Sequence, residues 1–104
     1  MQVPLIELAE AAELAAMFRL LGDPNRLRVL YALLEADELC VHDIAEVVGT
    51  SETKVSQAMR LLRTAGMVQN RRDGRHIYYS LDDAHVATVL ELSRLHLAHR
   101  GTGR

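Results

Sequence analysis

Hydrophobic residues recur along most of the chain with the spacing of helices that bury one face. Apolar positions three or four residues apart define five such segments, and a helix with one buried stripe has this period. The predicted helices cover residues 5–21, 25–36, 41–48, 51–64 and 83–99. Residues 37–40 are expected to be a connector, and residues 101–104 a frayed tail.

Turn and capping residues mark the ends of these segments. Gly22, Asp23 and Pro24 follow the first helix, and proline cannot continue it. Ser51 is a good N-cap for the fourth helix, and Gly66 is placed to follow its last turn. Either Asp82 or Asp83 can cap the last helix.

After Gly66 the period changes from that of a helix to that of a strand. Residues 67–71 and 76–80 are predicted strands, and the Asp73-Gly74 pair between them is a strong hairpin signal. The expected order is α-α-α-α-β-β-α. Two short helices joined by a glycine turn and followed by a basic hairpin describe a winged helix-turn-helix. We therefore predict one mainly helical α+β domain over residues 1–104, with terminal helices that form a homodimer.

The composition excludes several other classes of protein. The chain has 104 residues, and its single cysteine allows no internal disulfide and fits a reducing compartment. It contains no apolar run of roughly 18 residues, so no membrane span is expected. The acidic start has no basic region typical of a secretory signal. A cytoplasmic location, and no membrane or small organic substrate as partner, are the expectations.

The net charge of −2 conceals a basic segment. Residues 54–75 carry six basic residues and one acidic residue, for a net charge of +5, whereas the remainder of the chain carries −7. Because DNA phosphates respond to a local positive patch, this segment indicates a double-stranded DNA partner. The alternative is an ordinary solvated charged face.

The fourth helix carries the residues expected to meet DNA. If Val55, Met59 and Leu62 are buried, the opposite face presents polar side chains, of which glutamine can pair with adenine. Basic residues farther along the helix and on the hairpin are expected to neutralise phosphates. The alternative is that the polar residues are merely exposed. The candidates are Thr53, Lys54, Ser56, Gln57, Arg60, Arg63, Arg71, Arg72 and Arg75. Since one helix reads few base pairs, a dimer on an inverted repeat is expected.

The last helix carries four candidate metal ligands. Asp83 and His85 lie at its start, and His96 and His99 lie one turn apart near its end. The eleven residues from His85 to His96 span about 16.5 Å, too far for one ion. Two antiparallel copies would bring one chain's first pair to the other chain's second pair, giving two equivalent sites. Three imidazoles and a carboxylate suit zinc, with cobalt as a substitute. A polar dimer seam is the alternative.

These stretches resemble the ArsR/SmtB repressors over almost the whole chain. The resemblance lies in residues 21–30, 38–43, 51–66, 74–79 and 80–88, and is greatest for the zinc sensors of that family. It implies that Asp83, His85, His96 and His99 bind zinc across the dimer. It also implies a repressor that holds its operator without metal and releases it when metal binds.

The chain departs from that family in two places. Many relatives have Ser-His where this chain has Ser56-Gln57, so the preferred operator can differ. Some relatives carry a second metal site with a Cys-x-Cys core, where this chain has Cys40-Val41-His42. Cys40 and His42 are therefore candidates for a vestigial second site, and otherwise a buried and a surface residue.

Three other interpretations of the sequence remain open. A repressor of the same fold could sense nickel, cobalt or a thiol-reactive signal through Cys40. A catalytic zinc would define an enzyme, but the sequence shows no nucleophile–base arrangement, so we expect none. A winged helix that binds protein instead of DNA is the third.

Overall fold

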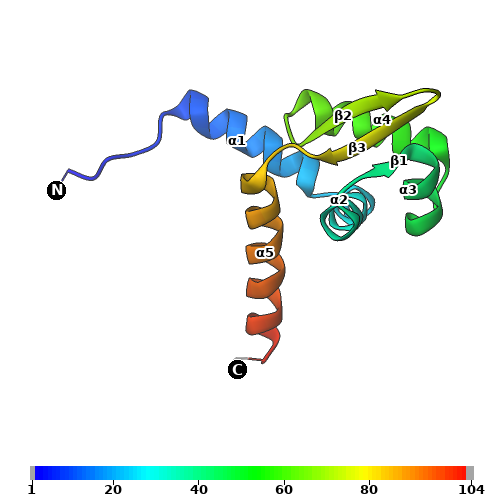
Figure 1. The fold of residues 1–104 in the computed structure, drawn as a ribbon. Helices are drawn as coiled ribbons and strands as arrows, with labels where there is room; N and C mark the ends of the chain where they lie inside the picture. Colours follow the sequence, from blue (N-terminus) through cyan, green and yellow to red (C-terminus); the bar gives the residue numbers. More distant parts are fainter. Residues whose placement is uncertain (1, 103–104) are drawn as a thin grey trace.

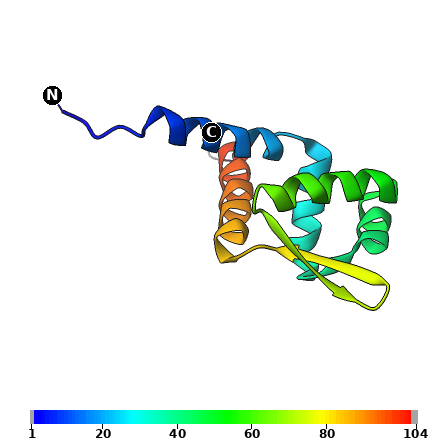
Figure 2. The same ribbon diagram turned by 90° about the horizontal axis from the view of Figure 1, so that it is seen from above.

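The computed structural model describes residues 2–102, which form a small body with two projecting helices (Figure 1). The body contains the three central helices and a β-sheet, and α1 and α5 extend away from it in different directions (Figure 2). In chain order the elements are α1 (Leu8–Leu21), α2 (Pro24–Ala36), β1 (Leu39–Cys40), α3 (Val41–Val48), α4 (Glu52–Thr64), β2 (Val68–Asp73), β3 (His76–Leu81) and α5 (Ala84–Thr102).

Side-chain caps start α2 and α4, and of these two caps the sequence predicts the one at Ser51. The Asp23 carboxylate accepts a hydrogen bond from the backbone N–H of Arg26 at 2.9 Å, with Pro24 in the first turn of α2. The Ser51 hydroxyl accepts one from the N–H of Lys54 at 3.1 Å at the start of α4. Between α3 and α4 the chain turns at Gly49, whose φ of 79° favours glycine. These features set the relative direction of the two helices.

The sheet has three antiparallel strands in the order β1-β3-β2. The two predicted strands are confirmed as β2 and β3, which close at Gly74 with a φ of 63°. The prediction of a connector over residues 37–40 is wrong at Leu39 and Cys40, which pair with Tyr79 and Tyr78. Two residues are too few to show a period, and their pairing with β3 is remote in sequence. The observed order is therefore α-α-β-α-α-β-β-α.

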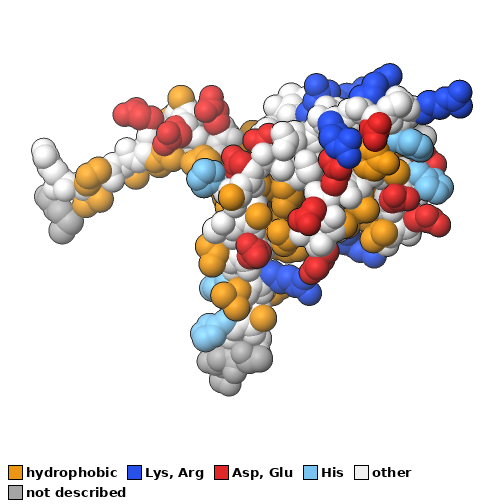
Figure 3. Space-filling view, in the orientation of Figure 1, with side chains coloured by type: hydrophobic (Ala, Val, Ile, Leu, Met, Phe, Trp, Pro, Cys, Tyr) orange, Lys and Arg blue, Asp and Glu red, His pale blue; other side chains and the backbone are white. Residues whose placement is uncertain are grey.

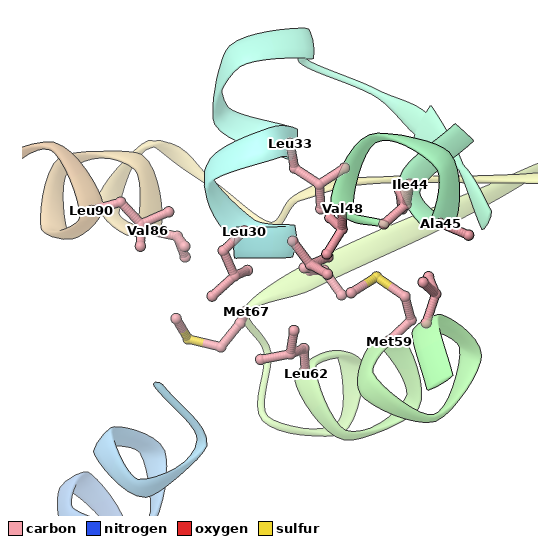
Figure 4. Close-up of a cluster of buried hydrophobic side chains, with 13 residues drawn as sticks. Leu30, Leu33, Ile44, Ala45, Val48, Met59, Leu62, Met67, Val86 and Leu90 are labelled. Atoms are coloured by element: carbon pink, nitrogen blue, oxygen red, sulfur yellow. The ribbon is translucent and has the colours of Figure 1, made fainter. Parts of the chain in front are cut away.

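The hydrophobic core joins the three central helices to the sheet (Figure 4). Leu30 and Leu33 of α2 and Ile44 of α3 lie on one side of this cluster, and Met59 and Leu62 of α4 lie on the other. All five side chains are at most 1% exposed. Burying such residues stabilises the fold by about 1.5–3 kcal/mol each, so α3 and α4 form one rigid unit with α2.

α5 joins the body mainly through its first half. Val86 and Leu90 are its buried residues, and the hydroxyl of Tyr31 on α2 donates to the carbonyl of Leu90 at 2.7 Å. The guanidinium of Arg94 lies 5.8 Å from the centre of the Tyr31 ring. Residues 91–100 are all exposed. No helix within residues 2–102 is both long and apolar enough to cross a membrane.

The two terminal helices differ from the prediction at their outer ends. α1 begins at Leu8 instead of residue 5, because Glu7 is extended and residues 2–10 are exposed, with no packing to hold another turn. The predicted tail is wrong at Gly101 and Thr102, which continue α5. Gly103 and Arg104, also in that prediction, lie outside the described residues.

Candidate DNA-binding surface and metal ligands

The two faces of α4 are separated as the sequence predicts. Val55, Met59 and Leu62 are 1%, 0% and 0% exposed and hold the helix against the core. The opposite face is solvent-exposed and contains Thr53, Lys54, Ser56, Gln57 and Arg60. A helix fixed in this way can present its polar face to the major groove as a rigid unit.

A polar groove lies between α4 and the sheet. Arg60 and Arg63 line it on one side and Tyr79 of β3 on the other, together with Ser56 and Thr64. Lys and Arg side chains gather along the edge above α4 and the hairpin (Figure 3). Thr64 and Tyr79 are absent from the predicted set. The period of two in β3 places Tyr79 on one face of the strand, but does not reveal that this face meets α4.

The three hairpin arginines are not equivalent. Arg72 and Arg75 are exposed around the tip. Arg71 instead makes a two-pronged contact with the Glu38 carboxylate, Nη2 to Oε1 at 2.6 Å and Nε to Oε2 at 2.8 Å. Its guanidinium also lies 4.8 Å from the centre of the Tyr78 ring. Glu38 is absent from the predicted set because it is 33 residues away, in the predicted connector.

Asp83 and His85 lie together at the start of α5. The Asp83 Oδ1 atom accepts from the backbone N–H groups of His85 at 2.8 Å and Val86 at 3.2 Å, and lies 3.4 Å from His85 Nδ1. The Val86 N–H, followed by the contacts with His85, lowers the pKa of Asp83, so the carboxylate is charged near neutral pH. All three contacts use Oδ1, so Oδ2 can take a metal ion without loss of the cap.

His96 and His99 are exposed at the far end of α5. One helical turn separates them, but about 16.5 Å of helix separates His96 from His85. Within a single copy the structure therefore brings together each predicted pair but not the two pairs. The four-ligand site stays a prediction that needs a second chain.

Cys40 and His42, the second candidate metal site, differ in their exposure to solvent. Cys40 is buried at the start of α3, whereas His42 is exposed beside it. His42 Nδ1 lies 3.2 Å from Glu52 of α4, and Nε2 lies 3.6 Å from Glu46. His42, Asp43 and Glu46 offer ligand atoms within 4.8 Å of one another, a group that does not include Cys40. Two carboxylates, one at each ring nitrogen, suit a protonated imidazole better than a metal ligand.

This arrangement raises the pKa of His42 above its ordinary value of 6.5. The hydrogen bond to Glu52 is the largest cause, followed by the charge of Glu46. Protonation of His42 thus strengthens its contact with Glu52, which links α3 to α4.

The fold and the exposed α4 face define a winged helix-turn-helix DNA-binding protein. Residues 23–70 match the model described as bacterial regulatory protein, arsR family. A cadmium resistance transcriptional regulatory protein homolog of Staphylococcus aureus is 38% identical over 81% of this chain and 69% of its own length. A transcriptional repressor SmtB homolog of Synechocystis is 43% identical over 85% of this chain and 66% of its own length. The chain thus spans about two thirds of these relatives.

Two solved structures share the whole architecture. The crystal structure of the AntR antimony-specific transcriptional repressor is 34% identical, with a TM-score of 0.83 over 100% of this chain and 93% of that one. A homodimeric winged helix-turn-helix domain from Mycobacterium bovis is 25% identical, with a TM-score of 0.81 over 94% and 92%. The chain belongs to the arsR family of bacterial regulatory proteins. It is a transcriptional regulator and not an enzyme.

Proposed function

We propose that the chain is a zinc-responsive repressor. Two copies bind an inverted-repeat operator in the absence of metal and release it when zinc binds between their α5 helices. The ligands are Asp83 and His85 of one copy with His96 and His99 of the other. The observation that carries this proposal is the arrangement of these residues at opposite ends of one projecting helix.

The surface of α5 supports a partner helix. Val89, Leu92 and Leu95 follow one another at helical spacing and are 40%, 58% and 65% exposed in a single chain. A row of exposed apolar side chains on one side of a helix indicates an interface with another element. The related Mycobacterium bovis domain is homodimeric. A second copy packed antiparallel on α5 would cover the leucines and bring the two ligand pairs to each other.

The donor set suits zinc. Three imidazoles and one carboxylate form a tetrahedral set with borderline-soft nitrogen ligands. The low pKa of Asp83 supplies the negative charge, and the exposed histidines can be reached from solvent. Imidazoles bind metal only when neutral, so protons compete with zinc and zinc affinity should be lower in acidic solution. Zinc when bound would fix the relative position of the two α5 helices.

The same geometry leaves nickel and cobalt as competing ions. One relative is named for cadmium resistance and one neighbour is described as antimony-specific, which supports a metal or metalloid signal for this chain. A thiol signal through Cys40 is less favoured because that side chain is 8% exposed. Binding of ion and operator must be reciprocally linked, so the effective metal is the one whose affinity falls when operator is bound.

A titration with two matched variants tests the proposal. Fluorescence anisotropy of an operator fragment from the upstream DNA is followed as Zn²⁺, Co²⁺ or Ni²⁺ is added to the dimer. The wild-type protein and His42→Ala should leave the DNA when zinc is added, whereas His96→Ala should bind DNA equally well but stay bound. Release of His96→Ala at the same zinc concentration would reject the site. Release by nickel alone would reject zinc as the signal.

A further inference from the structure

Glu38, Arg71 and Tyr78 form one connected group across all three strands of the sheet. Tyr78 is on the central strand β3 and faces Arg71 on β2 and Cys40 on β1. Glu38 lies directly before β1, and its carboxylate reaches Arg71 through both guanidinium hydrogen bonds. The Arg71 guanidinium lies over the Tyr78 ring at 4.8 Å. The group therefore spans the sheet from one edge strand to the other.

The geometry of this group requires an arginine. A planar guanidinium can present two parallel N–H groups to a carboxylate and still stack on an aromatic ring, whereas an ammonium group cannot do both. The Arg71 and Glu38 side chains are 54% and 33% exposed, and the Tyr78 side chain is half-buried. The Glu38 carboxylate takes two of the five guanidinium N–H groups and offsets the positive charge of Arg71, which weakens its attraction for a phosphate.

The group connects the two parts of the molecule that are proposed to contact DNA. β1 leads directly into α3, the first helix of the helix-turn-helix, while β2 and β3 form the hairpin that carries Arg72 and Arg75. Gly74 is the tip of that hairpin, and both arginines flank it. Backbone pairing alone leaves a two-stranded hairpin free to twist. A side-chain contact from β2 back to the start of β1 restrains that motion.

We propose that Glu38 and Tyr78 are positioning residues that hold Arg71 as the anchor of the hairpin. In this role Arg71 does not bind a phosphate itself. It fixes the angle at which Arg72 and Arg75 meet the DNA flanking the sequence under α4. The inference rests on the proposed DNA binding and adds residues that the sequence does not single out.

The sign of the effect of Glu38→Gln separates the two roles of Arg71. Removing an acidic charge near DNA should tighten binding if only long-range attraction counts or if Arg71 is released to bind a phosphate. If Glu38 positions the hairpin, the same change should weaken operator binding by roughly threefold or more. Arg71→Lys keeps the positive charge but cannot form the two-pronged contact, so it should weaken binding in the same way.

Operator binding is measured by anisotropy over a series of salt concentrations without metal, with Glu35→Gln as the matched control. Glu35 is an exposed acid on α2, so its removal should leave affinity unchanged or slightly raised. In Glu38→Gln and Arg71→Lys, the slope of log affinity against log salt should decrease in magnitude by about 0.9 for each phosphate that the hairpin no longer neutralises. The double variant should be no worse than either single variant. Unchanged or tighter binding by Glu38→Gln, with near-normal Arg71→Lys, would overturn the proposal.

A second measurement does not depend on DNA. Amide hydrogen exchange at residues 72–76 should be faster in Glu38→Gln than in wild-type protein, while exchange in α4 should be unchanged. Equal exchange in the hairpin of both proteins would also reject the anchor. If the wild-type protein fails to bind its upstream DNA, the proposed function fails, and this measurement still decides the role of Glu38.

Discussion

Gln57 is the exposed α4 residue best suited to read a base. Its amide can both donate to and accept from adenine, and it lies in the first half of the helix. We expect Gln57→Ala to lower affinity for the operator by about 1–3 kcal/mol and to change affinity for random DNA little. Competition binding with the two DNAs measures both, and equal losses on both would show that Gln57 reads no base.

His42 makes stability depend on pH in a defined direction. The carboxylates of Glu52 and Glu46 raise its pKa in the folded protein above 6.5. Its contribution is therefore fully present below about pH 6.5 and lost as the pH rises through the higher folded value. Urea unfolding with a chelator present should show wild-type stability falling, relative to His42→Asn, as the pH rises above about 6.5. The other histidines are common to both proteins, so parallel pH profiles would contradict the prediction.

The sequence predicts which side chains of a helix are exposed, but not which distant side chain a charged residue contacts. The exposed set on α4 can be predicted because helical period fixes which side faces the core. The hydrogen bonds from Arg71 to Glu38 cannot be predicted in this way. Glu38 is 33 residues away, and it comes close to Arg71 only after β1 pairs with β3. A charged residue's partner is a property of the folded sheet and not of the local chain.

At the scale of an element, the start of α4 depends on one hydroxyl. Ser51 accepts from the Lys54 N–H, which otherwise has no partner within the helix. Ser51→Ala should lower the free energy of unfolding by about 1 kcal/mol. It should also weaken operator binding, because the first turn of α4 carries Thr53 and Lys54.

Ser93→Ala is the matched control for this change. Its hydroxyl donates within α5 to the carbonyl of Val89 at 2.7 Å, and such a bond adds little to a helix. Denaturant unfolding of both variants gives the comparison. A loss of stability in Ser51→Ala no larger than in Ser93→Ala would mean that the cap does not hold α4.

Long periodic elements can be predicted, and short or poorly packed ones cannot. The predicted bounds of α3 and α4 agree with the structure within a residue because strong periods end at Gly49 and Gly66. β1 is not predicted because a strand of two residues is too short to show an alternating pattern. The predicted start of α1 is too early because period alone does not show that residues 2–10 lack packing.

At the scale of the whole molecule, the proposed dimer predicts the operator. Two α4 helices related by a two-fold axis meet successive major grooves about 34 Å apart, or about 10 base pairs. We expect inserting about five base pairs, half a helical turn, between the half-sites to reduce operator affinity to the level of random DNA. Gel-shift titrations of the two fragments measure this. Undiminished binding to the lengthened site would argue against a symmetric dimer.

The candidate metal site also belongs to this scale. Sequence spacing shows that one helix cannot close the four ligands, and the length of α5 agrees with that reasoning. Neither can place the partner helix, because the second copy's pose depends on surfaces of two chains. The zinc titration therefore tests two things together: whether a partner α5 covers the exposed leucines, and whether it completes the set of metal ligands.

The narrow attachment of α5 has a mechanical consequence. Val86, Leu90 and the Tyr31 hydroxyl all hold its first half, so about 18 Å of helix extends beyond Leu90. A tilt of about 10° at that pivot moves the far end by about 3 Å. In a pair in which the far end of each α5 is held by the start of the partner's α5, the bodies would move instead. A shift of the metal ligands on the order of an ångström would then turn each α4 helix out of alignment with the DNA major groove.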